Sequence, residues 1–414
     1  MKKKVLWISL NVPYDSVNHA GGKSHNFYIK NFQKSKKFDI HLISFMYSYE
    51  RGHIDLDKYN IDSTLIEISD NTTKTLFRKV VNTESTLNPF SKYAGIVPNF
   101  QRISVQKALK QFAMEGNNPD IIIVQWTQMI VFLPLIKDLF PNSITVAIEE
   151  DVAFLGYYRR YEYSPNSLIR RVNYYKYKKL KHIELNVLGM ADIVTINNPK
   201  DKKLIYKDLK DKTDIIQISP YFDNYKDVNR KKIKRNRKLL FFGAMQRKEN
   251  YLSVIWFIEK VLPLLSGLGI KVIVVGGNPS KQLLKYQSEI VEIKGFVEDI
   301  TPFFAESLCL IAPLVLGAGI KIKVLEAFSS GIPVLTNHIG IEGINAIPNK
   351  HYFHCETAEE YSETIKCLLN DYDETEISQN AKTLIEEEYN LERDMENLQI
   401  KILKKMGEQI LDEK

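Results

Sequence analysis

The stretch LCLIAPLVLGAGIKIKVLEAFSSGIPVLTN, residues 308–337, predicts a complete strand–helix–strand unit. Apolar residues are continuous over 308–314 and recur over 333–337. A glycine-bearing turn leads from the first run into a helix that we expect to begin near Ile320. Continuous apolar strands indicate a sheet that helices cover on both faces, and such sheets are parallel. This stretch therefore predicts a parallel α/β fold.

The same alternation of short apolar runs and longer amphipathic runs extends along the whole chain. Further strands are expected at 4–10, 40–46, 120–126, 143–150, 192–198, 214–220, 238–244, 271–277 and 291–297. A chain of 414 residues exceeds what one hydrophobic core usually contains, so we expect two domains. The predicted fold class is α/β, with two Rossmann-like, doubly wound parallel-sheet domains.

Composition shifts suggest where these domains begin and end. We expect the first domain over residues 1–221, a linker over 222–237 and the second domain over 238–390. The stretch KDVNRKKIKRNRK, 226–238, has no apolar periodicity, which is typical of an exposed linker. The last segment, 391–414, has apolar residues at helical spacing, and we expect a helix there that packs back on the first domain.

The composition excludes several classes of protein. The three cysteines, Cys309, Cys355 and Cys367, are too few and too poorly spaced for a disulfide framework or a zinc site. The start is basic and then apolar, but its apolar run is short and lacks a small-residue cleavage site. The longest apolar region, 121–136, is interrupted by polar residues and falls short of a membrane span. We therefore expect a cytoplasmic protein.

Charged residues of both signs follow the strand at 308–314, where parallel sheets bind ligands. Gly317 and Gly319 permit close backbone approaches that a side chain would prevent. The backbone amides of Gly319, Ile320 and Lys321 would be free donors at a helix N-terminus, which is a favourable place for an anion. Lys321 and Lys323 add positive charge. This pattern predicts a phosphate site.

Glu326 lies on the same helix among apolar residues, and a buried carboxylate requires partners. Ligand hydroxyls are suitable partners, so lysines for phosphate and a carboxylate for a sugar diol together indicate a nucleotide-sugar site. The alternative is an ordinary helical ion pair with Lys323, three residues earlier.

Three segments carry a resemblance to a known family. They are FFGAMQRKENYLSVIWFIEKVLPLL at 241–265, IVVGGNP at 273–279, and the stretch from GFVEDITPFF to HIGIEGI at 295–344. In order and spacing they resemble the retaining GT4-type glycosyltransferases of the GT-B fold, densely over 238–345 and more weakly over the first half. The resemblance implies two domains that face an interdomain cleft.

The resemblance also implies roles for particular residues. Arg247 and Lys248 stand where the family has basic residues that hold the donor diphosphate. Glu326 stands where a glutamate holds the ribose hydroxyls, and Asn250 where an asparagine fixes the loop after the glycine strand. Many members have a second glutamate that contacts the transferred sugar. Ala318 occupies that position here, so the sugar stays unassigned.

The first half supplies two further candidates. Gly21 and Gly22 follow the first strand, ahead of a helix expected near Ser24. The resemblance implies that their backbone approaches donor phosphate or acceptor, whereas a purely structural turn is the alternative.

The second candidate is the pair Glu150 and Asp151 at the end of the fourth strand. The family often has a His-Asp pair there, so we predict a catalytic role, either in binding the acceptor hydroxyl or as a base. Solvated or helix-capping acids are the alternative, and a metal role is not expected. For His25, which follows the glycine pair, a surface or structural role is favoured.

A basic and aromatic segment lies between residues 157 and 181. It contains eight Lys and Arg residues, seven tyrosines and a single acid. Tyrosine rings and cations on one helix suit a membrane interface. The predicted membrane- and acceptor-facing patch consists of Arg170, Arg171, Lys176, Lys178 and Lys179. A solvated helix face would explain the same charges, and no nucleic-acid motif accompanies them.

These features together predict a bacterial retaining hexosyltransferase. It would move a sugar from a UDP- or GDP-linked donor to a lipid-linked or cell-surface glycan, at the inner face of the cytoplasmic membrane, without a cofactor or metal and without nucleic acid. Two alternatives are a non-catalytic nucleotide-sugar-binding protein of a polysaccharide assembly complex and a sugar-nucleotide epimerase of similar architecture.

Overall fold

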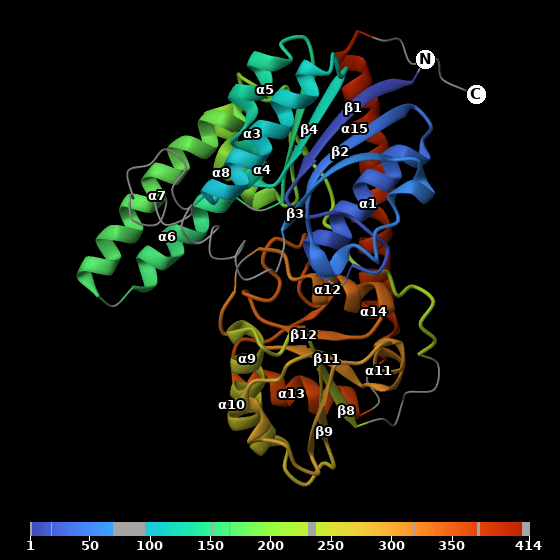
Figure 1. The fold of residues 1–414 in the computed structure, drawn as a ribbon. Coiled ribbons are helices and arrows are strands. Elements are labelled where there is room, and N and C mark those ends of the chain that lie inside the picture. The colour runs from blue at the N-terminus through green and yellow to red at the C-terminus, as the bar shows by residue number, and fades with distance from the viewer. Residues whose placement is uncertain are drawn as a thin grey trace. The chain divides into compact units, whose positions relative to one another are not determined.

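The chain folds into two compact units in a computed structural model (Figure 1). The structure describes residues 2–17, 19–68, 96–150, 152–164, 166–230, 237–317, 319–370 and 373–407. Unit 1 consists of Met1–Tyr221 together with Leu391–Lys414, and unit 2 is Phe222–Asn390.

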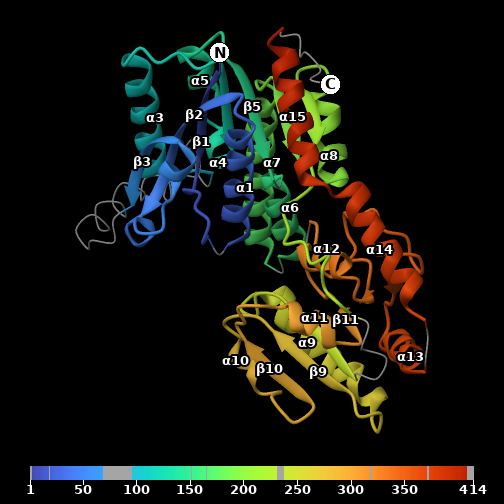
Figure 2. The ribbon, with the colours of Figure 1, turned by 90° about the vertical axis from the view of Figure 1, so that its right-hand side faces the viewer.

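Unit 1 contains a parallel sheet of seven strands in the order β3-β2-β1-β4-β5-β6-β7. The strands are β1 (Lys3–Ser9), β2 (Phe38–Tyr47), β3 (Asp62–Ile68), β4 (Ile121–Gln125), β5 (Ile144–Glu149), β6 (Ile193–Ile196) and β7 (Asp214–Gln217). The helices are α1 (Ala20–Lys34), α3 (Asn99–Met114), α4 (Thr127–Ile130), α5 (Leu133–Leu139), α6 (Ala153–Tyr163), α7 (Ser167–Leu188), α8 (Pro199–Leu209) and α15 (Leu391–Lys405). Figure 2 shows α3 beside the edge strand β3.

The central strand β1 has apolar side chains on both faces. Leu6 and Ile8 lie in one core layer, while Val5 and Trp7 lie in the other. This alternation follows from the two-residue period of a strand, and it explains why the whole run is apolar. The predicted parallel α/β class is confirmed for unit 1.

The C-terminal helix α15 completes one of these layers. Leu391, Met395, Leu398 and Ile402 are buried in the same core layer as Trp7. Helices α1 and α15 lie side by side (Figure 1). The two ends of the chain therefore build one unit.

Unit 2 contains a parallel sheet of six strands in the order β10-β9-β8-β11-β12-β13. The strands are β8 (Lys238–Phe242), β9 (Lys271–Val275), β10 (Val291–Gly295), β11 (Cys309–Ala312), β12 (Val334–Thr336) and β13 (Phe353–His354). The helices are α9 (Lys248–Lys260), α10 (Lys281–Leu284), α11 (Thr301–Glu306), α12 (Ile322–Ser330), α13 (Ala358–Leu369) and α14 (Thr375–Glu388). Core layers cover both faces of this sheet, as the apolar strands predicted.

Part of the segment predicted as a linker, 222–237, packs on unit 2, although Asn224, Lys226, Asp227 and Asn229 are exposed. Phe222, Tyr225 and Val228 pack against the core of unit 2. The Arg230 side chain is 11% exposed, and its guanidinium donates hydrogen bonds to the carbonyls of Phe304 and Ser307. This packing gives the segment a fixed place on unit 2. Residues 231–236 lie outside the described residues.

Two helix starts also differ from the prediction. Helix α1 begins at Ala20, four residues before Ser24, and α12 begins at Ile322 rather than Ile320. Within the described ranges, no helix combines the length and the apolar character that crossing a bilayer requires.

Candidate functional site

The loops that follow β8 and β9 touch each other at the carboxyl edge of the sheet in unit 2. Gly243 and Gly276 have φ values of +146° and +150°. A Cβ atom at Gly276 would lie 1.7 Å from the carbonyl oxygen of Gly243. No residue with a side chain fits there, so the two glycines allow the backbones of neighbouring strands to meet.

Lys323, in the first turn of α12, reaches this edge. Its Nζ donates to Oδ1 of Asn250 at 2.6 Å and lies 4.5 Å from the centre of the Phe241 ring. The same Nζ is 2.9 Å from the position that a Cβ of Gly243 would take. The side chain of Lys323 on α12 therefore lies directly at the glycine loop that follows β8.

The surroundings of Lys323 lower the pKa of its ammonium group. Burial, followed by the positive charges of Arg247 and Lys321, lowers the pKa of Lys323 to about 7. The carboxylates of Glu249 and Glu326 act in the opposite direction. An anion bound beside this ammonium would restore the charged form.

Asn250 has the loop-fixing role that the resemblance implied. Its Nδ2 donates to the carbonyl of Ala244 at 2.9 Å, while its Oδ1 accepts from Lys323. The side chain therefore joins the loop after β8 to the start of α12.

Lys321 lies at the N-cap position of α12, and its side chain is 9% exposed. The ammonium folds back and donates to the carbonyl of Gly319 at 2.6 Å, and it lies 3.9 Å from the Glu342 carboxylate. No side chain among the described residues caps this helix start by a hydrogen bond. Gly317 and Gly319 have φ values of +136° and +68°, which the turn requires.

Glu326 is half-buried on α12. Its Oε1 accepts a long hydrogen bond of 3.5 Å from the backbone amide of Asp223. The alternative pairing with Lys323 is not formed within the described residues, because the lysine bonds Asn250 instead. The Glu326 carboxylate therefore contacts the segment that precedes β8.

Arg247 and Lys248 begin α9 and are both exposed. The Arg247 guanidinium, with a 65% exposed side chain, lies 2.5 Å from the Glu249 carboxylate. Of the basic residues predicted to hold phosphate, Lys323 is thus more deeply placed than either residue of this pair. The sequence pattern did not distinguish them.

The loop after β11 is held from two sides. The amide of Val315 donates to Oγ of Ser253 on α9 at 3.1 Å, and Nδ2 of Asn337 donates to the carbonyl of Leu314 at 2.8 Å. These contacts fix the glycine turn that leads to Lys321. Ala318 lies outside the described residues. Sequence reasoning missed Ser253 and Asn337, although both lie in segments that carry the resemblance, because their hydrogen bonds to the loop depend on how distant segments pack.

A second group of predicted residues meets at the carboxyl edge of the sheet in unit 1. Gly21 and Gly22 lie inside the first turn of α1, not before the helix, and Nδ1 of His19 accepts from the amide of Gly22 at 3.0 Å. A Cβ atom at Gly21 would lie 3.5 Å from the Trp126 ring and 3.9 Å from Oε2 of Glu150. Three separate segments of the chain therefore converge here.

Glu150 is held in this cluster by buried polar groups. Nε2 of Gln125 donates to Oε1 of Glu150 at 3.0 Å, and Oε1 of Gln125 accepts from Nε1 of Trp7 at 3.3 Å. Asp151, the other predicted catalytic acid, lies outside the described residues. Sequence reasoning did not identify Gln125 or Trp126, which end an apolar strand run.

The segment after Glu150 is fixed by a buried carboxylate. Glu184 of α7 accepts hydrogen bonds from the amides of Ala153 and Phe154 at 2.7 and 2.9 Å, at the start of α6. Burial raises the pKa of Glu184 to about 7, although the two amide bonds oppose the shift.

The loop before α1 is fixed by a charged network. The ammonium of Lys30 lies 2.6 Å from Asp15 and 3.0 Å from Asp55, and 3.9 Å above the Tyr59 ring. Lys30 holds the pKa of the Asp15 carboxyl well below its usual range. These contacts join the loop before α1 to the third turn of that helix.

His25 has the structural role that the sequence favoured. It is fully buried, and its Nδ1 bonds the carbonyl of Asn11 at 3.0 Å. Burial lowers the pKa of His25 to about 3, so the ring is neutral at physiological pH.

The predicted membrane patch lies on the hairpin of α6 and α7, whose far end projects from the sheet of unit 1 (Figure 1). Arg170, Arg171, Lys176 and Lys178 are exposed, whereas Lys179 is half-buried and desolvation lowers its pKa. Large apolar side chains are exposed between these cations, namely Leu168 (69%), Ile169 (55%), Val172 (45%) and Tyr175 (44%). The hairpin end therefore combines apolar and cationic groups.

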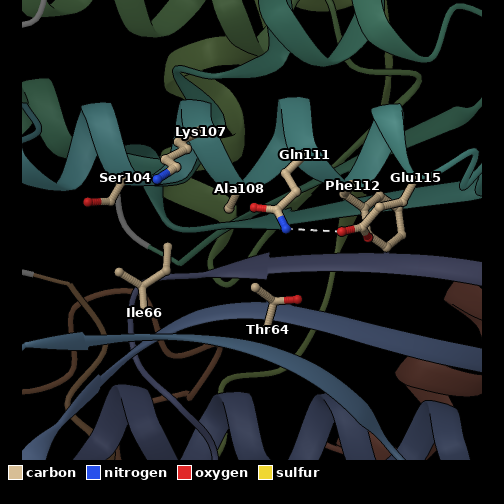
Figure 3. A pocket seen from close by; sticks show the side chains of 8 residues that line it. All are labelled: Thr64, Ile66, Ser104, Lys107, Ala108, Gln111, Phe112 and Glu115. Carbon is tan, nitrogen blue, oxygen red and sulfur yellow. Dashed lines mark hydrogen bonds between the residues drawn. The ribbon is translucent and has the colours of Figure 1, made fainter.

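A separate pocket of about 260 Å³ lies between β3 and α3 (Figure 3). Polar and apolar side chains both line it, and Nε2 of Gln111 donates to Glu115 at 3.0 Å along the α3 side of the pocket. None of the predicted site residues lines this pocket.

Part of the chain matches a protein family. Residues 236–371 match the family model described as glycosyl transferases group 1. This range contains Gly243, Asn250 and Lys323, which meet at the sheet edge of unit 2, and it also contains Glu326. No curated protein sequence matches the chain.

Solved structures share the fold over the whole chain. HepE from Anabaena, solved in complex with UDP, is 13% identical with a TM-score of 0.63, and the match covers 98% of this chain and 100% of that one. Sucrose-phosphate synthase from Thermosynechococcus elongatus is 11% identical with a TM-score of 0.66, over 98% and 100%. A glycosyltransferase from Rickettsia africae is 16% identical with a TM-score of 0.59, over 99% and 100%. The predicted class of two Rossmann-like parallel-sheet domains, as in GT-B structures, is confirmed.

Proposed function

We propose that this chain is a retaining glycosyltransferase that moves a sugar from a nucleotide-diphosphate sugar to an acceptor glycan. The observation that carries the proposal is the meeting of Lys323, Asn250 and Gly243 at the sheet edge of unit 2. This cluster lies within the segment that matches glycosyl transferases group 1. The Anabaena neighbour was solved with UDP, which supports a UDP-linked donor.

In the proposal, unit 2 holds the donor. The touching glycine loops after β8 and β9 present backbone without side chains, so a phosphate can approach closely. Lys323, Lys321 and the first amides of α12 supply positive charge for the diphosphate. Arg247 and Lys248 contribute from the start of α9, and Glu326 accepts hydrogen bonds from the ribose hydroxyls.

The chemistry follows from this charge arrangement. The bond between the anomeric carbon and the diphosphate oxygen breaks, a bond to the acceptor oxygen forms on the same face of the sugar, and the proton of the acceptor hydroxyl passes to the departing diphosphate oxygen. Negative charge grows on the leaving diphosphate, and fixed cations beside it stabilise the transition state more than the ground state. Glu150 of unit 1 accepts the hydrogen bond of the acceptor hydroxyl, and we retain Asp151 as its predicted neighbour.

We further propose that the hairpin of α6 and α7 holds the protein on the inner face of the cytoplasmic membrane. Its exposed leucine, isoleucine, valine and tyrosine would enter the interface, while the arginines and lysines would contact anionic headgroups. An acceptor that is itself attached to a lipid would be reached there.

A thermal-shift measurement tests the donor site. UDP-, GDP-, ADP- and TDP-glucose are added to the purified protein, because a ligand that binds only the folded state raises its melting temperature. We expect one nucleotide sugar to raise it and Glu326→Ala to remove the effect. Glu386→Ala, an exposed carboxylate of α14 in the same unit, is the matched control.

A melting temperature that no donor changes would refute donor binding. Donor turnover then separates an enzyme from a protein that only binds. Release of nucleotide diphosphate in the presence of acceptor glycans is expected for a transferase, while binding without turnover favours the non-catalytic alternative.

A further inference from the structure

A cavity of about 340 Å³ lies at the end of the α6–α7 hairpin, in the part that projects from the sheet of unit 1 (Figure 1). Two helices line it. Tyr161 comes from the last turn of α6, and Ser167, Arg170, Arg171 and Tyr174 come from the first turns of α7. None of the residues proposed to hold the donor or the acceptor hydroxyl lines this cavity.

Contacts between the two helices fix the walls of the cavity. Oγ of Ser164, which follows α6, donates to the carbonyl of Arg160 at 2.6 Å, and Nδ2 of Asn173 on α7 donates to Oγ of Ser164 at 3.0 Å. The rings of Tyr161 and Tyr174 have centres 5.1 Å apart and planes tilted by 48°. These contacts join the end of α6 to the first turns of α7 around the cavity.

The two arginines give the cavity a positive charge. The Arg170 guanidinium lies 4.9 Å from the centre of the Tyr161 ring, a cation–π contact that orients it. The first turn of α7 contains no acid, and Glu162 of α6 accepts a hydrogen bond from the Tyr158 hydroxyl. Among the described residues, no carboxylate forms an ion pair with Arg170 or Arg171. The charge is therefore available to a ligand.

Side chains rather than the helix start supply the hydrogen-bond donors of this cavity. Oδ1 of Asn166 already accepts from the amides of Leu168 and Ile169, at 2.9 and 3.2 Å. The guanidinium groups and the hydroxyls of serine and tyrosine remain as donors. A guanidinium matches the geometry of phosphate oxygens, and a phosphate ester offers three acceptor oxygens and more than one negative charge. This set of donors therefore fits a phosphate.

Apolar side chains beside the cavity indicate what carries the phosphate. Leu168 and Ile169 lie in the same turn of α7 as Ser167, and Val172 follows one turn later. All three apolar side chains are exposed. A phosphate in free solution would gain nothing from them, whereas a lipid brings acyl chains and an anionic headgroup together.

We propose that Tyr161, Ser167, Arg170, Arg171 and Tyr174 form a binding site for the phosphate of an anionic membrane lipid. The inference deepens the proposed membrane contact and rests on it for the source of the lipid. Charge spread over a surface attracts every anionic membrane, whereas a lined cavity binds one phosphate per protein and saturates. The hairpin therefore selects lipids by their headgroup.

The test is calorimetry on the full-length protein with dihexanoyl phosphatidic acid, below the concentration at which this short-chain lipid forms micelles. Without a bilayer, diffuse attraction to a charged surface does not contribute. We expect saturable binding of one lipid per chain. Dihexanoylglycerol has the same chains without the phosphate and should not bind. Inorganic phosphate lacks the chains and should bind at least about tenfold more weakly.

Two variants test the cavity itself. Arg170→Gln and Arg171→Gln should each weaken binding of the short-chain lipid at least about tenfold, because each removes charge-assisted hydrogen bonds. The control is Lys207→Gln on α8, which removes the same charge from another exposed side chain and should bind as the wild type does. Circular dichroism establishes that each variant is folded, and where one arginine variant is not, the other decides.

The proposal is overturned if phosphatidic acid does not bind in solution, or if the folded arginine variants bind it as the wild type does. Inorganic phosphate that binds as tightly as the lipid would overturn the assignment to a lipid. Sedimentation with anionic vesicles tests the membrane contact separately. Vesicle binding without binding of the short-chain lipid overturns the cavity proposal alone. Absence of vesicle binding counts against the proposed membrane contact, and the short-chain lipid still decides the cavity.

Discussion

Because the pKa of Lys323 is lowered to about 7, we expect the affinity for the donor to fall as the pH rises through neutrality. With a pKa of about 7, the free protein loses this charge as the pH rises through neutrality. A bound diphosphate favours the charged ammonium, so the complex keeps the proton. Binding therefore takes up a proton above pH 7, and affinity must fall as the pH rises.

The size of the effect follows from the pKa. Between pH 6 and pH 8.5 the charged fraction of the free side chain falls from nearly all to about 3%, so affinity should fall about 30-fold, or about 2 kcal/mol. Lys323→Met should bind more weakly at pH 6 and show almost no change up to pH 8.5.

The assay is calorimetry with the nucleotide sugar that the thermal-shift panel selects. A nucleotide sugar is preferred to free UDP, because its diphosphate does not titrate in this range. Lys281→Met, an exposed lysine of α10, should behave as the wild type does. Constant affinity in the wild type, or an equal pH response in Lys323→Met, would refute the reasoning.

Three further predictions concern the rest of the molecule. The double variant Arg170→Glu with Arg171→Glu should release the protein from sedimenting anionic vesicles. The control, Lys203→Glu with Lys207→Glu on α8, makes the same change of charge and should leave the protein bound. Equal release by both double variants would contradict the hairpin proposal. Gly276→Ala should destabilise unit 2 by more than about 3 kcal/mol, because the added Cβ would clash with the Gly243 carbonyl. Gly52→Ala is the control, since the space around Gly52 is open, and its melting temperature should equal that of the wild type. Equal melting temperatures for the two variants would exclude the close approach of the two loops. Glu184→Ala should lower stability by about 1–3 kcal/mol in urea unfolding, because it leaves two amides of α6 without their acceptor, and an unaltered midpoint would show that these bonds contribute little.

Local patterns explain how much of the fold could be predicted. The apolar runs at 308–314 and 333–337 coincide with buried strands, because a strand covered on both faces needs apolar residues throughout. Strand β3 was not predicted, since it lies at the sheet edge and most of its residues are exposed or half-buried. The sequence did not predict that Arg230 is fixed on unit 2, because its contacts are made with residues more than 70 positions later, which no local pattern reveals.

The sequence predicted the types of residue at the candidate site, but it predicted only in part how these residues lie relative to one another. Glycine and lysine after a strand predicted a phosphate site in the region of Lys323, because flexible backbone and positive charge come together there. Their sequence could not show that Lys323 crosses to Asn250, since a side-chain direction depends on the packing of two helices and a strand. The sequence did not single out Trp126, because a tryptophan at the end of an apolar run gives the same pattern whether it lies at the sheet edge or in the core.

The return of α15 to unit 1 has a consequence for synthesis on the ribosome. Residues 222–390 form unit 2, so all of them must be translated between the two parts of unit 1, before the helix that closes its core layer. At ordinary elongation rates this takes about 10–35 s. During that interval the nascent first unit presents the apolar surface that Met395, Leu398 and Ile402 later cover, while unit 2 has every residue it needs to fold. The second unit can therefore be complete before the first.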